Sequence, residues 1–325
     1  MSTSTDADPA AYFAAGHAAV RSNVERALSG KPQAVRMALT CLFAGGHLLV
    51  EDVPGVGKTT LAKAIAASIE ASWHRIQFTP DLLPTDITGT TVYDQKTGTF
   101  DFRQGPVFSH VVLADEINRA SPKTQSALLE VMEERQVTVD GRAHPVPTPF
   151  LVVATQNPID LQGTYRLPEA QLDRFLLRIA VGYPDLAAER DLIMGRARAG
   201  APPELRPVVT VDQIRWMIEY VSRVYVSEPV AEYVARIAEA TRTASQLQLG
   251  ISPRGSLALV RTAQAWAACE GRGYVTPDDV KAVAEAALAH RLVLAPQAEI
   301  DGLTAAGVVS EIMSRVIVPV PAGAR

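Results

Sequence analysis

The residues best suited to chemistry form the string Asp-Val-Pro-Gly-Val-Gly-Lys-Thr-Thr, which begins at Asp52. The string matches the phosphate-binding pattern G-x-x-x-x-G-K-[ST], except that Asp52 replaces the first glycine. Such a loop points its backbone N–H groups at phosphate oxygens, and Gly55 and Gly57 allow the turn that this requires. Lys58 is expected to contact the β- and γ-phosphates, and Thr59 to offer its hydroxyl to Mg²⁺.

An acidic pair, Asp115 and Glu116, directly follows the apolar run Val-Val-Leu-Ala. Carboxylates at the end of a buried strand are costly unless they bind a cation or accept hydrogen bonds. We expect Asp115 to hold Mg²⁺ together with Thr59, and Glu116 to orient and deprotonate the attacking water. The residues predicted to bind the nucleotide are Pro54, Gly55, Val56, Gly57, Lys58, Thr59, Thr60 and Asp115.

Two further polar residues have a functional and a structural interpretation. Asn157 follows the apolar run 150–155, where its amide could hold the lytic water, but Asn-Pro is also a common turn opener. Arg174 lies in the string Pro-Glu-Ala-Gln-Leu-Asp-Arg-Phe. It could be an ordinary ion-pair partner of Asp173 or Glu169, or it could reach the γ-phosphate held by a neighbouring subunit.

Arg254, in Ser-Pro-Arg at the start of a predicted helix, is the last catalytic candidate. It could fold back onto the phosphates and report the state of the nucleotide, or it could be a surface arginine. The set of predicted catalytic residues is Glu116, Lys58, Asn157, Arg174 and Arg254.

Strands and helices alternate up to about residue 181, which predicts an α/β fold with a parallel sheet. The predicted strands are 47–51, 75–78, 111–114, 150–155 and 176–181. Later residues are helical almost throughout, with predicted helices at 187–199, 211–222, 229–243, 255–269 and 277–290. We therefore divide the chain into a disordered start (1–14), an α/β core (15–185) and a C-terminal all-α part (186–325).

Two segments interrupt the alternation and are predicted to be β-hairpins, 90–103 and 136–144. The second contains Asp-Gly between alternating residues, which is a strong hairpin signal. Neither hairpin has enough apolar residues for a core. They are expected to be surface loops or projecting fingers.

Composition narrows the class of protein. The 325 residues carry 31 basic and 35 acidic side chains, a net charge of −4, which is not typical of a general nucleic-acid binder. Two cysteines indicate a reducing compartment. The polar start does not look like a signal peptide, and the apolar runs are too short to span a membrane. We expect a cytoplasmic protein, and the six histidines show no spacing typical of a structural metal site.

In this order and spacing the motifs resemble those of an AAA+ ATPase, and several strings are similar to the MoxR family. They are EDVPGVGKT, IQFTPDLLPTDITG, FRQGPVFSHVVLADEINRASPKTQSALLEVMEERQVTVDG, ATQNPID and LPEAQLDRF. The resemblance implies that Asn157 is the sensor 1 residue, Arg174 the arginine finger and Arg254 the sensor 2 residue. It also implies a P-loop ATPase core over 15–185 with a helical lid over 186–325, and ATP and Mg²⁺ as cofactors. The hairpins are then expected to face the pore or a rim of a ring, usually a hexamer.

The resemblance further implies a chaperone-like role in the maturation of a partner, with a protein that carries a von Willebrand A domain. Arg119 matches a position that could serve the subunit interface. Gln77, on the strand beside the acidic pair, could turn Glu116 away from the attacking water.

Two other functions remain open at this stage. Helicase-type AAA+ rings also carry these hairpins, but a finger that tracks phosphates should be net basic. Here the basic side chains Lys96, Arg103 and Arg142 are opposed by Asp94, Asp101 and Asp140. A transcriptional activator is disfavoured because no helix-turn-helix tail is apparent, so a nucleic-acid motor is the main alternative to a protein remodeller.

Overall fold

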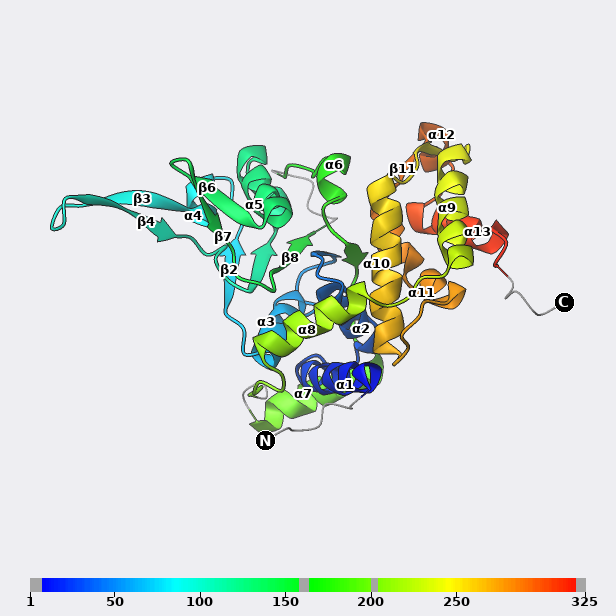
Figure 1. Cartoon of the computed structure of the whole chain (residues 1–325), viewed down its shortest axis with the longest axis horizontal. Coiled ribbons are helices and arrows are strands. Elements are labelled where there is room, and N and C mark those ends of the chain that lie inside the picture. Colours follow the sequence, from blue (N-terminus) through cyan, green and yellow to red (C-terminus); the bar gives the residue numbers. More distant parts are fainter. Residues whose placement is uncertain (1–7, 158–163, 200–203, 320–325) are drawn as a thin grey trace.

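The computed structural model describes residues 8–157, 164–199 and 204–319, and its centre is a five-stranded parallel sheet (Figure 1). In spatial order the strands are β2 (Trp73–Gln77), β5 (Val111–Asp115), β8 (Leu151–Gln156), β1 (Leu48–Glu51) and β9 (Leu177–Ile179). All neighbours run parallel, so their carboxyl ends meet at one edge and their amino ends at the other. We call these the carboxyl edge and the amino edge. The parallel sheet predicted from the apolar runs is confirmed.

The strands are apolar on both faces because helices cover both sides of the sheet. On β1, Leu48 and Val50 join one buried cluster, whereas Leu49, between them, joins the other. The first face is covered by α1 (Pro9–Ala27), α2 (Pro32–Phe43) and α3 (Lys58–Ser68), and the second by α4 (Pro84–Thr88) and α5 (Pro122–Glu134) (Figure 1).

The N-terminal helix starts earlier than the sequence predicts. α1 begins at Pro9, within the stretch 1–14 that was expected to be disordered. The Asp8 side chain accepts a hydrogen bond from the Ala10 N–H, and proline suits the first turn of a helix. Phe13 is fully buried and packs its ring against Phe43. This contact anchors the first turns of α1 to the core.

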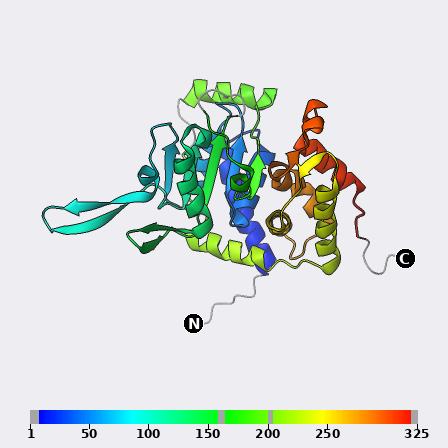
Figure 2. The same ribbon diagram turned by 90° about the horizontal axis from the view of Figure 1, so that it is seen from above.

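Both predicted hairpins are present, and they leave the sheet on the same side. They are formed by β3 (Gly89–Asp94) with β4 (Thr99–Gln104), and by β6 (Gln136–Val139) with β7 (Arg142–Pro145). Figure 2 shows the β3–β4 hairpin reaching far beyond the rest of the molecule. The two hairpins touch each other, because the Thr91 hydroxyl donates to Asp140 at 2.6 Å and the rings of Phe102 and His144 lie 4.3 Å apart.

The C-terminal part is helical, as predicted. Its helices are α7 (Leu186–Ala199), α8 (Val211–Ser222), α9 (Glu228–Thr243), α10 (Pro253–Cys269), α11 (Pro277–Leu288), α12 (Pro296–Ile300) and α13 (Ala305–Arg315). A 3-10 turn, η2 (Ala289–Arg291), follows α11, and β10 (Leu247–Leu249) pairs with β11 (Val293–Leu294).

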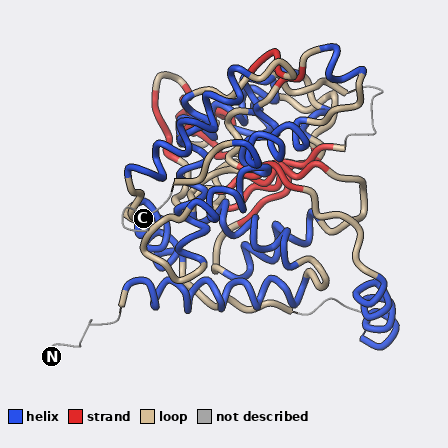
Figure 3. The backbone as a smooth tube through the Cα atoms, turned by 90° about the vertical axis from the view of Figure 1, so that its right-hand side faces the viewer, coloured by secondary structure: helices blue, strands red, loops and turns tan. Residues whose placement is uncertain are grey.

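The predicted boundary near residue 185 is not a break in the core. Buried side chains of α8, such as Ile214 and Met217, belong to the same cluster as those of α1 and α2. α7, by contrast, stands apart from the other helices in Figure 3. Among the described residues, no helix is both long and apolar enough to cross a membrane.

Candidate active site

The phosphate-binding loop connects the end of β1 to the start of α3. Gly55 has a φ of 86° and Gly57 a φ of 103°, the left-handed region that favours glycine. A Cβ on Gly57 would also lie 2.8 Å from Leu28 Cδ1. Pro54 and Gly55 are exposed, and Thr59 and Thr60 are half-buried in the first turn of α3. Both glycines are therefore required by the turn itself.

Lys58 is buried at the start of α3, with 9% of its surface exposed. Its ammonium donates to the backbone carbonyl of Asp52 at 2.7 Å. Burial lowers the pKa of Lys58 below its usual value, while the carboxylates of Asp115 and Asp52 oppose that shift. The Lys58 ammonium is thus held within the loop by the uncharged Asp52 carbonyl, which a phosphate oxygen can replace as its partner.

Asp52, which departs from the strict motif, fixes the loop to the edge strand of the sheet. One carboxylate oxygen accepts the N–H groups of Val181 at 2.8 Å and Gly182 at 2.6 Å, just beyond β9. The other accepts the N–H of Val53 at 2.8 Å. An acidic side chain makes these charge-assisted bonds, which glycine could not make.

The acidic pair is organised by Thr155 on the neighbouring strand β8, a residue that the sequence analysis missed. Its hydroxyl donates to Asp115 Oδ1 at 2.6 Å and accepts the N–H of Glu116 at 2.9 Å. Glu116 itself has a left-handed backbone, with a φ of 58°. Thr155 is fully buried, and a polar residue at the end of an otherwise apolar run was the signal in the sequence.

Two residues of β2 contact the acidic pair. Arg75 donates from Nη2 to Asp115 Oδ2 at 2.7 Å. Gln77 donates from Nε2 to Glu116 Oε2 at 2.9 Å, and Arg119 Nε lies 3.2 Å from the same oxygen. The Glu116 carboxylate is therefore held by the Gln77 amide and the Arg119 guanidinium. The Gln77 contact is the one needed if Gln77 is to turn Glu116 away from the attacking water.

The oxygens available here suit a small divalent cation. Mg²⁺ prefers carboxylate and hydroxyl oxygens together with water and phosphate, and Asp115 and Thr59 offer such groups. Asp115 forms an ion pair with the guanidinium of Arg75, so its carboxylate has room for a positively charged partner. Asn157 directly follows β8, between the strands that carry the acidic pair and the loop. The carboxyl edge thus gathers the predicted nucleotide, metal and sensor 1 residues.

Arg174 and Arg254 lie together on one carboxylate. Glu133, near the end of α5, pairs with Arg174 Nε at 2.9 Å through Oε2 and with Arg254 Nη1 at 3.1 Å through Oε1. The arginine side chains remain 28% and 47% exposed. Two residues that are eighty positions apart in the sequence therefore form one surface cluster, which we call the arginine pair.

The arginine pair lies at the amino edge, opposite the phosphate-binding loop. His47, directly before β1, bonds to Met132, the residue next to Glu133, and its carbonyl accepts the N–H of Leu176. A five-residue strand such as β5 separates the two edges by about 16 Å. Arg254 therefore lies away from the phosphate-binding loop of its own chain, because it pairs with Glu133 beside Arg174. Its predicted action on the phosphates stays a prediction.

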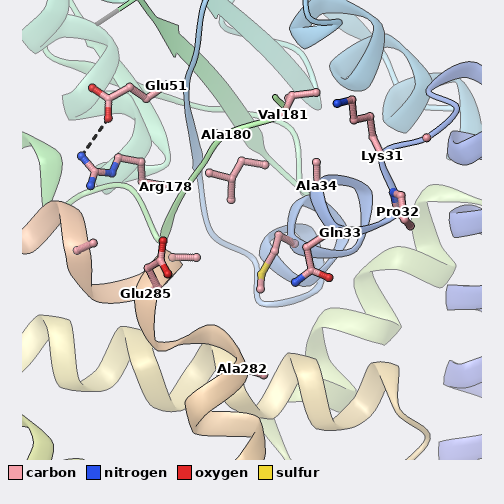
Figure 4. A pocket seen from close by; sticks show the side chains of 15 residues that line it. Lys31, Pro32, Gln33, Ala34, Glu51, Arg178, Ala180, Val181, Ala282 and Glu285 are labelled. Atoms are coloured by element: carbon pink, nitrogen blue, oxygen red, sulfur yellow. Dashed lines mark hydrogen bonds and ion pairs between the residues drawn. The ribbon is translucent and has the colours of Figure 1, made fainter. Parts of the chain in front are cut away.

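A cavity of about 620 Å³ opens between the sheet and the lid (Figure 4). Its walls come from the start of α2, the end of β9 and one face of α11, and Glu51, the last residue before the loop, lines it. Glu51 accepts a hydrogen bond from Arg178 of the neighbouring strand β9 at 3.0 Å, at one side of the cavity (Figure 4). Apolar side chains of Met37, Ile179 and Ala286 complete the lining.

Comparison with known proteins agrees with this geometry. The model of the ATPase family associated with various cellular activities (AAA) matches residues 47–177, and that of the AAA lid domain matches residues 239–312. The chaperone MoxR1 of Mycobacterium tuberculosis is 44% identical over 91% of this chain and 80% of its own. The chain belongs to the MoxR family of AAA ATPases.

Two further comparisons cover nearly the whole chain. The Bacillus subtilis protein YeaC, whose function is uncharacterised, is 48% identical over 92% of this chain and 93% of its own. A crystal structure of a protein from Cytophaga hutchinsonii, assigned as an ATPase, superimposes with a TM-score of 0.89 at 37% identity and covers 96% of this chain. The predictions of an AAA+ fold with a helical lid and of ATPase activity are confirmed.

Proposed function

We propose that this MoxR-family ATPase works as a ring, in which the arginine pair of one subunit completes the nucleotide site of the next. The position of the pair at the amino edge supports this proposal, because neither guanidinium lies beside the phosphate-binding loop of its own chain. A guanidinium next to the γ-phosphate offsets the charge that develops during hydrolysis. A hexamer is the ring size that the family resemblance implies.

In this scheme the chain's own residues bind the nucleotide and prepare the attacking water. Lys58 exchanges the Asp52 carbonyl for phosphate oxygens, and Thr59 and Asp115 hold Mg²⁺, which neutralises phosphate charge when it is bound. Glu116 leaves Gln77 and Arg119 and takes the proton from the water. Asn157 keeps that water in place.

We further propose that the nucleotide base enters the cavity beside β9. The cavity adjoins Glu51, where β1 leads into the phosphate-binding loop, and its size and its mixture of apolar and polar lining residues suit an aromatic base that carries hydrogen-bonding groups. Replacing Ala286 by phenylalanine should fill it. That variant should bind ATP more weakly than the wild type and inorganic tripolyphosphate equally well, as measured by titration calorimetry.

The expected output of ATP hydrolysis is the remodelling of a protein partner, with a von Willebrand A domain protein as the adaptor. The relative MoxR1 is named a chaperone, and the long β3–β4 hairpin exposes Tyr93 and Phe100, which can contact a polypeptide. The mixed charge of the hairpins does not favour nucleic acid. Salt-dependent DNA binding with stimulated ATPase activity would contradict this proposal.

Subunit mixing tests the shared site. Arg174→Ala should bind ATP but not hydrolyse it, because its loop is intact, and Glu116→Gln should also bind ATP without turnover. A mixture of the two should regain ATPase activity at interfaces that combine an intact Glu116 with an intact Arg174. If the mixture stays as inactive as its components, Arg174 does not act on a neighbouring subunit.

A further inference from the structure

A buried arginine of the lid, Arg291, makes several contacts with the loop around Arg174. The side chain of Arg291, in the 3-10 turn η2 of the lid, is only 3% exposed. Its guanidinium donates from Nε to Asp173 Oδ1 at 2.7 Å, from Nη2 to the Phe175 carbonyl at 2.7 Å and from Nη1 to the Leu176 carbonyl at 3.2 Å. These acceptors lie on both sides of Arg174 in the chain.

A second contact links the same loop to the helix that carries Arg254. Ser252, the residue before α10, donates from its hydroxyl to Asp173 Oδ2 at 3.2 Å. Asp173 therefore uses one oxygen for Arg291 and the other for Ser252. Both partners belong to the C-terminal helical part, and Arg254 follows Ser252 by two residues.

A glycine of α10, Gly255, leaves space for the side chain of Arg291. A Cβ on Gly255 would lie 3.2 Å from Arg291 Cδ and 3.1 Å from Ile251 Cβ. Burial lowers the pKa of Arg291, whereas Asp173 opposes that shift by its charge and its hydrogen bond. Buried ionic groups of this kind are expensive unless every donor is used. Here Nε and Nη2 of Arg291 bond to residues 173–175, and Nη1 is shared between the Leu176 carbonyl and the Ala287 carbonyl of the lid itself.

We propose that Arg291 is the positioning residue for the arginine pair, joining the Arg174 loop and the start of α10 into one unit that moves with the lid. This inference rests on the proposed action of Arg174 on a neighbouring subunit. Arg291 is buried behind the loop and acts only through Arg174. Its role is to fix the direction in which Arg174 leaves the backbone.

Arg291→Lys tests the proposal because lysine keeps the charge but cannot span the three acceptors at once. The kcat for ATP should fall about 10²-fold, as expected when a transition-state group is displaced by about 1 Å. The dissociation constant for ATP should not change, because the phosphate-binding loop lies at the other edge. Asp173→Asn should show the same pattern, and it decides the question if Arg291→Lys does not fold.

The matched control is Arg272→Lys, which changes a lid arginine that pairs with the buried Asp279 and does not touch the Arg174 loop. This variant should keep the wild-type kcat. The proposal is overturned if Arg291→Lys and Asp173→Asn keep the wild-type kcat, or if they lose ATP affinity in step with kcat.

Subunit mixing separates this inference from the proposed function. Arg291→Lys should regain activity when it is mixed with Glu116→Gln, which supplies an intact arginine pair. It should gain nothing with Arg174→Ala, since both partners then lack a positioned arginine. Rescue by Arg174→Ala overturns the inference alone. Failure of Glu116→Gln to rescue Arg174→Ala overturns the shared site and, with it, the inference.

Discussion

At the scale of single residues, the active site depends on side chains that fix the backbone around the catalytic groups. Thr155 joins Asp115 to the backbone of Glu116, and Asp52 joins the phosphate-binding loop to the end of β9. Neither side chain contacts a reacting atom in the proposed scheme. Each sets the distance between two strands that arrive from different parts of the sequence.

Replacing Thr155 by valine should lower kcat by about 10²-fold, because the Asp115 carboxylate loses its donor and the Glu116 N–H its acceptor. Thr155→Ser keeps the hydroxyl and is the matched control. Steady-state ATPase assays should show serine close to the wild type and valine much slower. Equal rates for the two variants would contradict the role of the hydroxyl.

Replacing Asp52 by glycine restores the strict phosphate-loop pattern but removes the acceptor for three N–H groups. We therefore expect Asp52→Gly to weaken ATP binding and to lower the free energy of unfolding by about 2 kcal/mol. Urea unfolding and nucleotide titration measure both effects. Asp52→Asn keeps part of the acceptor set and should fall between the wild type and glycine.

Candidate catalytic residues were easier to find in the sequence than the side chains that hold them in place. Gly57, Lys58, Asp115 and Glu116 were recognisable because phosphate and metal chemistry demands those types at fixed spacing. Arg75 and Thr155 were not, since their roles arise only from strand order and register. The predicted roles of Lys58, Asn157 and Arg174 stay predictions, as does the cytoplasmic location.

At the scale of elements, the base of the β3–β4 hairpin is closely packed. A Cβ on Gly105 would lie 2.3 Å from the Ile87 carbonyl oxygen and 2.5 Å from the Gly89 nitrogen. The hairpin can therefore leave α4 at its observed angle only with glycine at this position. Alternating residues and an expected turn revealed the hairpin in the sequence, but they did not reveal this close approach.

Gly105→Ala should loosen the hairpin at a cost of about 1–3 kcal/mol, the usual range for overpacking. Trypsin should then cleave faster after Lys96 and Arg103, while ATP binding remains unchanged. Gly273→Ala is the control, because the nearest atom to its Cβ would be 3.8 Å away. Equal cleavage rates in the two variants would count against a constrained base.

At the scale of the whole molecule, the layered arrangement of sheet and helices could be predicted from the sequence, but the way in which the lid packs on the core could not. Helical periodicity predicted α8, α10 and α11, yet α8 packs beneath the core and α10 brings Arg254 to Arg174. Such contacts join residues that are far apart in the chain and depend on tertiary packing. The predicted boundary near 185 therefore separates two sequence patterns within a shared hydrophobic core.

Three buried histidines tie the pH dependence of stability to this shared core. Burial lowers the pKa of His17 to about 4 and those of His47 and His290 well below the usual value of 6.5. Below pH 6.5 the unfolded chain takes up protons at these histidines and the folded chain does not. The free energy of unfolding therefore decreases as the pH is lowered. The slope should reach about 4 kcal/mol per pH unit between pH 6 and 5.

Urea unfolding at a series of pH values measures that slope. His17→Phe keeps a ring against Phe43 and should reduce the slope by about 1.4 kcal/mol per pH unit. An unchanged slope in this variant would show that His17 is protonated in the folded protein.

Glu133 has a consequence for how subunits meet. One carboxylate pairs with two guanidinium groups and offsets one of their two positive charges, so Glu133 holds both arginines while the cluster keeps a net positive charge. In the proposed ring, the phosphates of an ATP-loaded neighbour form an anionic surface that can draw the guanidinium groups away from Glu133, whereas a neighbour without ATP offers no such surface. The affinity between subunits should therefore be higher when ATP is bound, because the triphosphate contacts residues of both subunits.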